Sequence, residues 1–183
     1  MRRLAILGII AISVGCFSME IKSEIRADGK GTQTMILYGP KDNESFFGGM
    51  ADSLAKELGT EAKRTQKGDT VYYTIEKKNH DFTKASEGQK PLVTKQGDKW
   101  VFEMISEGSG QEEEMTKSAF EGHTFRLTVT LPGKILTHNA TKAKGNTLIW
   151  EMPMYDFQVR GLNARAEYQP GKGGFGCNCA KAN

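Results

Sequence analysis

The chain has 183 residues, 38% of them hydrophobic and 26% charged, which suits one globular domain plus a targeting segment and excludes a chain that is disordered throughout. Its formal net charge of +3 falls to +1 without Arg2 and Arg3, because 23 basic residues then face 22 acidic ones. A nearly neutral domain has no electrostatic attraction to nucleic acid, so we exclude that class of partner.

The N-terminus has the composition of a lipoprotein signal peptide. Arg2 and Arg3 are basic, and the apolar run over residues 4–14 is shorter than the roughly 20 residues that span a bilayer as a helix. The run leads into the motif Ser13-Val14-Gly15-Cys16, which resembles the bacterial lipobox. In that motif the cysteine is acylated and the signal is cut in front of it. We therefore expect a signal peptide over residues 1–15 and an exported chain that Cys16 anchors to the cell membrane or the outer membrane. The alternatives are a secretory signal with an incidental cysteine and a buried core helix.

A hairpin and a helix are predicted next. Residues 19–25 and 32–38 alternate as strands do, and a Gly-rich turn joins them. A helix is predicted from the polar cluster at residues 42–45 to Gly59, with an apolar face at helical spacing. Gly48 and Gly49 either weaken this helix by about 1 kcal/mol each or permit its close approach to a sheet.

Further strands are predicted along the rest of the chain, with a solvated loop at residues 107–117. The strands cover residues 70–76, 92–95, 99–105, 124–131, 135–137, 147–150 and 162–168. The pattern predicts an α+β fold, in which one main helix packs on a curved, mainly antiparallel sheet of about seven strands. We expect one soluble domain over residues 16–169 and a loose Gly-rich tail over residues 170–183.

One stretch of sequence is distinctive. It runs through the motifs Val129-Thr130-Leu131-Pro132-Gly133-Lys134-Ile135, Asn139-Ala140-Thr141 and Gly145-Asn146-Thr147-Leu148-Ile149-Trp150. The order of strand, Pro-Gly, short strand, Asn-containing turn and strand ending in Trp resembles the LppM-like lipoprotein domain. Matches earlier and later in the chain are Asp28-Gly29, Met152-Pro153 and Leu162-Asn163-Ala164. The resemblance covers residues 16–168. It implies a fold similar to small lipid-binding domains and a role with envelope glycolipids.

A helix over a twisted sheet can leave a slot between the layers, and such slots bind apolar ligands. The candidate lining residues are the large apolar side chains of the predicted helix and strands: Phe46, Phe47, Met50, Leu54, Tyr72, Phe102, Phe125 and Trp150. The alternative is that these side chains pack a closed core, which is usual for apolar residues at such spacing.

Residues with catalytic or metal chemistry are sparse. His80, His123 and His138 have no histidine or cysteine at zinc-ligand spacing, and no serine occupies a nucleophile elbow, so we expect no enzyme, no metal site and no cofactor. Cys177 and Cys179 are candidates for a local disulfide, a link to another chain or an idle tail. A redox or soft-metal role is the alternative.

Two functions remain. The first is a membrane-anchored, non-enzymatic binding domain for a lipid or glycolipid. The second is a structural or assembly lipoprotein that binds an envelope protein. A cavity would favour the first, whereas a closed core with an exposed apolar patch would favour the second.

Overall fold

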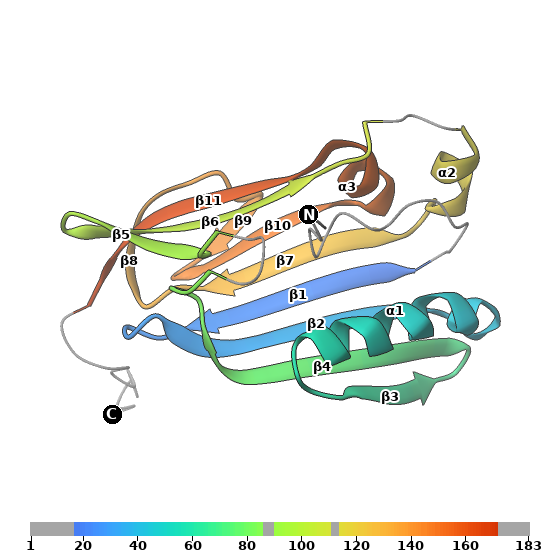
Figure 1. Cartoon of the computed structure of the whole chain (residues 1–183). Coiled ribbons are helices and arrows are strands. Elements are labelled where there is room, and N and C mark those ends of the chain that lie inside the picture. Colours follow the sequence, from blue (N-terminus) through green and yellow to red (C-terminus); the bar gives the residue numbers. More distant parts are fainter. Residues whose placement is uncertain (1–16, 86–89, 111–113, 172–183) are drawn as a thin grey trace, which may run out of the picture.

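The computed structural model describes residues 17–85, 90–110 and 114–171. Two β-sheets pack face to face, and helix α1 (Glu44–Glu57) lies beside the smaller sheet on the inner face of the larger one (Figure 1). This arrangement buries the apolar faces of both sheets and of the helix in one core. Three shorter helical segments complete the described part of the chain: η1 (Lys41–Asn43), α2 (Glu114–Ala119) and α3 (Met154–Arg160).

The larger sheet has seven strands. In spatial order they are β3 (Ala62–Lys67), β4 (Thr70–Asp81), β2 (Lys30–Pro40), β1 (Ser18–Ile25), β7 (Thr124–Thr130), β10 (Thr147–Pro153) and β9 (Lys142–Lys144). All neighbouring strands are antiparallel except β1 and β7, which run parallel. Parallel neighbours need a long connection, and here the chain between them includes α1, three strands of this sheet and two of the four strands of the second sheet.

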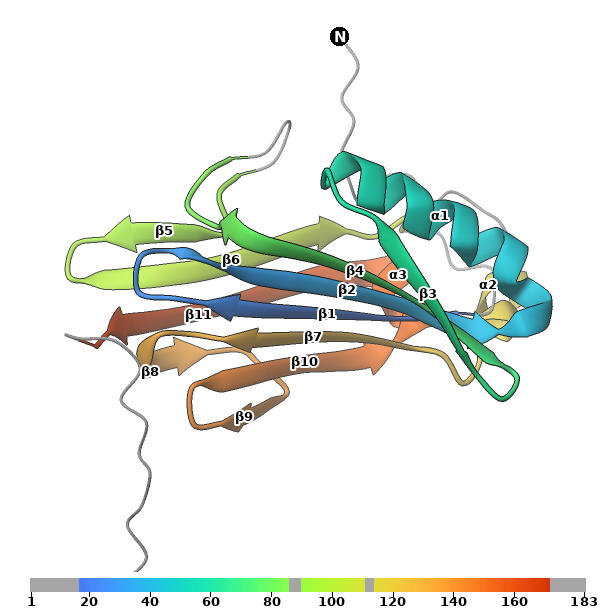
Figure 2. The ribbon, with the colours of Figure 1, turned by 90° about the horizontal axis from the view of Figure 1, so that it is seen from below.

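The smaller sheet has four strands, all antiparallel. In spatial order they are β5 (Val93–Gln96), β6 (Lys99–Glu107), β11 (Gly161–Pro170) and β8 (Gly133–His138). The two central strands, β6 and β11, pair along eight residues each, from Gly161 opposite Glu107 to Tyr168 opposite Trp100. Figure 2 shows this sheet and α1 on the same side of the larger sheet.

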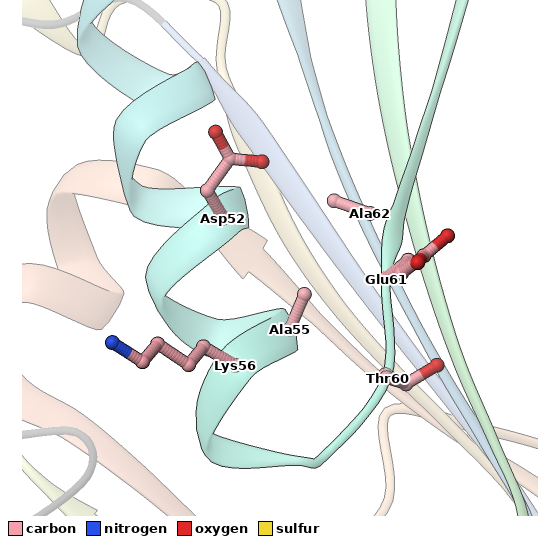
Figure 3. Close-up of a pocket in the computed structure, with 6 residues that line it drawn as sticks. All are labelled: Asp52, Ala55, Lys56, Thr60, Glu61 and Ala62. Atoms are coloured by element: carbon pink, nitrogen blue, oxygen red, sulfur yellow. The ribbon is translucent and has the colours of Figure 1, made fainter.

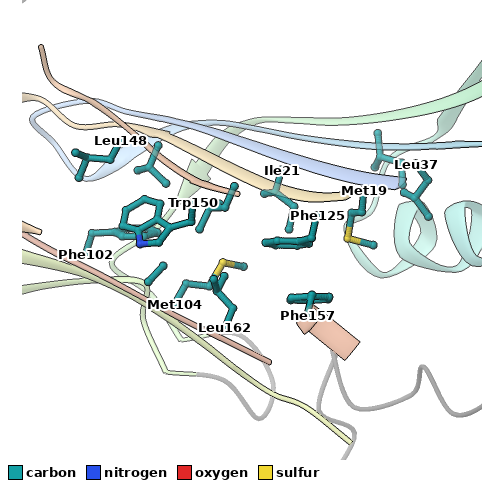
Figure 4. Close-up of a cluster of buried hydrophobic side chains, with 14 of the residues drawn as sticks. Met19, Ile21, Leu37, Phe102, Met104, Phe125, Leu148, Trp150, Phe157 and Leu162 are labelled. Atoms are coloured by element: carbon teal, nitrogen blue, oxygen red, sulfur yellow. The ribbon is translucent and has the colours of Figure 1, made fainter. Parts of the chain in front are cut away.

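The core forms where strand alternation points side chains between the layers. On β7 the buried residues alternate as Phe125, Leu127 and Val129, and Trp150 lies beside Leu127 on β10. From the smaller sheet, alternate residues of β6 and β11 face them (Figure 4). The same period-two pattern predicted these strands from sequence.

Helix α1 packs closely on the larger sheet through Gly48. A Cβ atom at Gly48 would lie 3.0 Å from the hydroxyl of Tyr73 on β4, whereas a Cβ atom at Gly49 would meet nothing within 4 Å. The expectation that these glycines permit close approach is therefore confirmed for Gly48 and is wrong for Gly49.

The α+β class and the seven-stranded sheet with a packed main helix are confirmed. The second sheet was not predicted, although its strands were. Four elements were also missed: β3, β9, α3, and α2, which occupies part of the predicted loop. Within the described residues, no helix combines the length and apolar character needed to cross a bilayer. The predicted signal peptide, the lipidation candidate Cys16 and most of the tail lie outside those residues.

Candidate ligand-binding site

Four of the predicted slot residues lie in the closed core. Phe47, Phe102 and Phe125 have no exposed surface, and Trp150 is 3% exposed. The ring of Phe102 lies 6.1 Å from that of Trp150, while Phe125 stacks on Phe157 of α3 at 3.9 Å between ring centroids. Figure 4 shows Phe102, Phe125, Trp150 and Phe157 in the space between the two sheets. The alternative given by the sequence, a packed core, describes these residues.

Tyr72 does not face the helix. Successive residues of a strand point to opposite faces, and it is the neighbouring Tyr73 that contacts Phe47 of α1, at 5.9 Å between ring centroids. Tyr72 instead stacks on Tyr38 at 5.4 Å on the outer face of the larger sheet. The prediction that Tyr72 lines the space under the helix is therefore wrong.

The remaining slot residues lie on α1. Phe46, Met50 and Leu54 recur every four residues along one side of the helix and are partly buried against the core. They are the members of the predicted set on the helix that keep some exposed apolar surface, so the structure separates them from the buried residues between the sheets.

A pocket of about 420 Å³ lies between the C-terminal half of α1 and the start of β3 (Figure 3). Its lining comprises two small apolar residues and four polar ones: Asp52, Ala55, Lys56, Thr60, Glu61 and Ala62. The Thr60 hydroxyl already donates a hydrogen bond to the carbonyl oxygen of Glu76. Elsewhere in the lining, the charges of Asp52, Lys56 and Glu61 have no ion-pair partner among the described residues. This composition suits a polar group better than an acyl chain.

An ion pair fixes the helix that forms one wall of the pocket. The Arg64 guanidinium on β3 donates two hydrogen bonds to the Glu44 carboxylate at the start of α1, and the Tyr73 hydroxyl donates a third at 2.8 Å. These hydrogen bonds, chiefly that from Arg64, lower the pKa of Glu44 from 4.5 to about 2. The carboxylate therefore stays charged and joins α1 to two strands.

The three histidines lie in three separate places. His80 packs edge-on against Phe82 at 4.7 Å, and His123 lies beside Ser18, whose hydroxyl is 3.4 Å from its Nδ1. Burial is the main cause that lowers the pKa of both histidines. The third, His138, accepts a hydrogen bond from the backbone N–H of Ala140. Throughout the described ranges, no three His, Cys, Asp or Glu side chains gather as they would around a metal ion.

The family is decided by a sequence comparison. A family model described as the LppM domain matches residues 17–168. The chain belongs to the LppM domain family. Its fold also resembles the NMR structure of the folded domain of Mycobacterium tuberculosis LppM, with a TM-score of 0.54 and 9% sequence identity, over 88% of this chain and 94% of that one. At this identity the likeness shows the fold alone. A search of curated proteins found no match.

The Pro-Gly motif of this LppM domain has a structural role. Gly133 begins β8 with a φ of +134°, a conformation that side chains disfavour. A Cβ atom there would also overlap the carbonyl oxygen of Gln169 on β11. The motif therefore allows β8 to pair with β11. The sequence resemblance to the LppM-like domain thus rested on residues with a structural role.

The polar pocket residues were missed from the sequence. Their signal is weak, because β3 and the turn before it are polar and exposed, with no apolar alternation to reveal a strand. The lipidation candidate Cys16 and the cysteine pair Cys177 and Cys179 lie outside the described residues.

Proposed function

We propose that this protein is an exported lipoprotein, anchored through Cys16, whose LppM domain binds a lipid or glycolipid of the cell envelope and catalyses no reaction. The observation that carries the proposal is the pocket beside α1, which is open to solvent and has a volume of about 420 Å³. Family membership and the lipobox at Cys16 support the anchored part of the proposal.

The polar lining of the pocket indicates which part of the ligand it holds. Phe47, Phe102 and Phe125 are fully buried, so an acyl chain between the sheets would have to displace a close-packed core. Lys56, by contrast, is an exposed lining residue whose amino group points away from β3 in Figure 3, and rotation of this long side chain would bring a cation to a phosphate or a hydrogen-bond donor to a sugar. The pocket therefore suits the polar head of a lipid or glycolipid.

Native mass spectrometry with lipid extraction tests the proposal. The exported domain carrying Cys16→Ser is purified from its own host, and a co-purifying lipid at about one per chain is expected. Two pocket variants, Lys56→Glu and Glu61→Trp, should lose most of this lipid, whereas Lys95→Glu, on exposed strand β5, should retain it. An unliganded mass that does not change after incubation with host lipid extract contradicts lipid binding.

A second function is favoured by the closed core and by two exposed apolar side chains. Ile105 is 60% exposed and Leu136 is 43% exposed, both on the smaller sheet. Such side chains fit a structural or assembly lipoprotein that binds an envelope protein. Crosslinking from position 105 or 136 in whole cells to one specific protein, combined with the absence of bound lipid, would favour this function over the first.

A further inference from the structure

Phe17, which directly follows the lipidation candidate Cys16, is packed in the core. Phe17 has no exposed surface, and its ring contacts three others: Phe46 and Phe47 of α1, at 6.1 and 6.3 Å, and Phe120 after α2, at 6.1 Å. Pairing with the neighbouring strand begins one residue later, where Ser18 lies opposite Tyr38. The N-terminus of the domain is therefore fixed from Phe17 onward.

This leaves no linker between the anchor and the fold. Consecutive Cα atoms are about 3.8 Å apart, so the Cα atom of the residue that carries the anchor lies at that distance from the Cα atom of a fully buried residue. A flexible linker would let a domain turn freely above a membrane, and here no residue is available for one. The place where the chain enters the domain then decides which side faces the bilayer.

We propose that the LppM domain stands end-on at the membrane, with the end of the sandwich where β1 begins against the lipid head groups. The proposal rests on the lipid anchor of the proposed function. Figures 1 and 2 place the starts of β1 and α1, the β3–β4 turn, α2 and α3 together at this end. These segments form the surface that meets the bilayer.

The orientation is set by the absence of a linker between Cys16 and Phe17, and charge does not explain it. The exposed side chains at this end carry both signs: Lys41, Lys67 and Lys117 against Asp42, Asp69 and Glu121. Because neither sign dominates, attraction to anionic lipids is weak. We therefore expect the orientation to be the same at low and high salt.

The opposite end of the sandwich lies far from the bilayer in this arrangement. β11 runs away from α3 for 10 residues, about 33 Å at 3.3 Å per residue, to Pro170. The segment that carries Cys177 and Cys179 therefore leaves the domain at the end that points away from the membrane. The pocket at Lys56 lies 12 residues along α1 from Glu44, about 18 Å at 1.5 Å per residue. A lipid of the same leaflet would reach it with an extended head group.

Fluorescence quenching from the membrane surface tests the orientation. Full-length acylated protein is inserted in vesicles of phosphatidylethanolamine and phosphatidylglycerol that contain a lipid spin-labelled on its head group. In a background of Cys177→Ser and Cys179→Ser, a fluorophore is placed by Asp42→Cys in η1 or by the matched Asp98→Cys in the β5–β6 turn, both exposed. Quenching several-fold stronger at position 42 than at position 98 is expected, at low and high salt alike.

A variant with an added linker tests whether the direct connection of Cys16 to Phe17 causes the orientation. About ten Gly and Ser residues inserted between Cys16 and Phe17 reach roughly 17 Å as a random coil, which should bring the quenching at the two positions close together. Equal quenching at positions 42 and 98 without the insertion, or stronger quenching at 98, overturns the orientation.

The anchor is checked separately by the mass of the N-terminal peptide and by membrane retention of the wild type against Cys16→Ser. An acylated, retained protein with equal quenching overturns only the orientation. An N-terminus without acyl chains overturns the orientation together with the anchored part of the proposed function.

Discussion

The indole N–H of Trp150 donates a hydrogen bond to the side-chain oxygen of Asn139 at 2.9 Å, and this contact joins the two sheets. The same oxygen accepts the backbone N–H of Arg165 at 2.8 Å, and the Asn139 amide nitrogen donates to the carbonyl oxygen of Asn163 at 2.8 Å. Trp150 belongs to the larger sheet, whereas Asn163 and Arg165 belong to the smaller one. Asn139 and Trp150, both from the distinctive sequence stretch, therefore belong to one hydrogen-bond network that connects the two sheets.

Replacing Asn139 should lower the stability of the fold. Asn139→Ala leaves the Trp150 indole N–H, 3% exposed as a residue, without its acceptor, and an unsatisfied buried donor costs about 1–3 kcal/mol. Urea unfolding followed by tryptophan fluorescence measures the change. The control is Asn163→Ala, because Asn163 takes part through its backbone carbonyl and its side chain is exposed. Equal loss in the two variants would contradict the role of the Asn139 amide.

The two neighbouring glycines of α1 should respond differently to alanine. Gly49→Ala gains helix propensity in open space and should raise the free energy of unfolding by about 0.5–1 kcal/mol. Gly48→Ala gains the same propensity but presses on the Tyr73 hydroxyl, which donates to Glu44. Gly48→Ala should therefore be the less stable of the pair in urea unfolding. The reverse order would show that α1 does not approach β4 through Gly48.

Alanine at Gly133 should destabilise the domain more than alanine at another glycine with positive φ. Gly145 has a φ of +61° and open space around it, so Gly145→Ala carries only the backbone cost, about 1–2 kcal/mol. Gly133→Ala adds overlap with the backbone of Gln169 and should separate the edges of β8 and β11. Thermal unfolding compares the two variants, and protection of the β8 amides from hydrogen exchange reports the strand. A milder effect at Gly133 would contradict the close pairing.

Acid should destabilise the protein in two pH windows. The folded pKa values of His80 and His123 lie below the ordinary 6.5, chiefly through burial, so the unfolded chain binds protons first and stability falls as pH drops below about 6.5. Glu44, with a folded pKa of about 2 against 4.5, contributes stability above pH 4.5 that is lost between 4.5 and 2. Glu151 and Glu167 act in the same direction as Glu44 in the acid range, since ion pairs lower both pKa values.

Variants separate the two windows. A double variant, His80→Gln with His123→Gln, should flatten the urea midpoint between pH 7 and 5 and leave the lower window in place. Glu44→Gln should reduce the loss between pH 4.5 and 2 and leave the upper window unchanged. A wild-type midpoint that stays constant from pH 7 to 5 would contradict burial of the neutral histidines.

Local patterns in the sequence predicted most individual elements. The alternation along residues 124–131 and the apolar face of the helix predicted at residues 42–59 are properties of neighbouring residues, and both elements formed near those bounds. The lipobox at Cys16 is likewise a local signal, and it remains a prediction. The strand Ala62–Lys67 was missed because its exposed polar side chains carry no alternation, and pairing with β4 alone makes it a strand.

The sequence by itself determined most of the segments that become strands and the main helix, because hydrophobic periodicity is a property of residues a few positions apart. Only the tertiary structure decided which strands share a sheet, since β6 and β11 pair across more than 50 intervening residues. It also decided which of two neighbouring tyrosines faces α1. Tyr72 and Tyr73 are residues of the same type, and the register of β4 with β2 turns Tyr73 toward the helix. The same long-range packing buries Phe102 and Phe125 in the core. The candidate site is therefore the polar pocket beside α1 and not a slot between the layers.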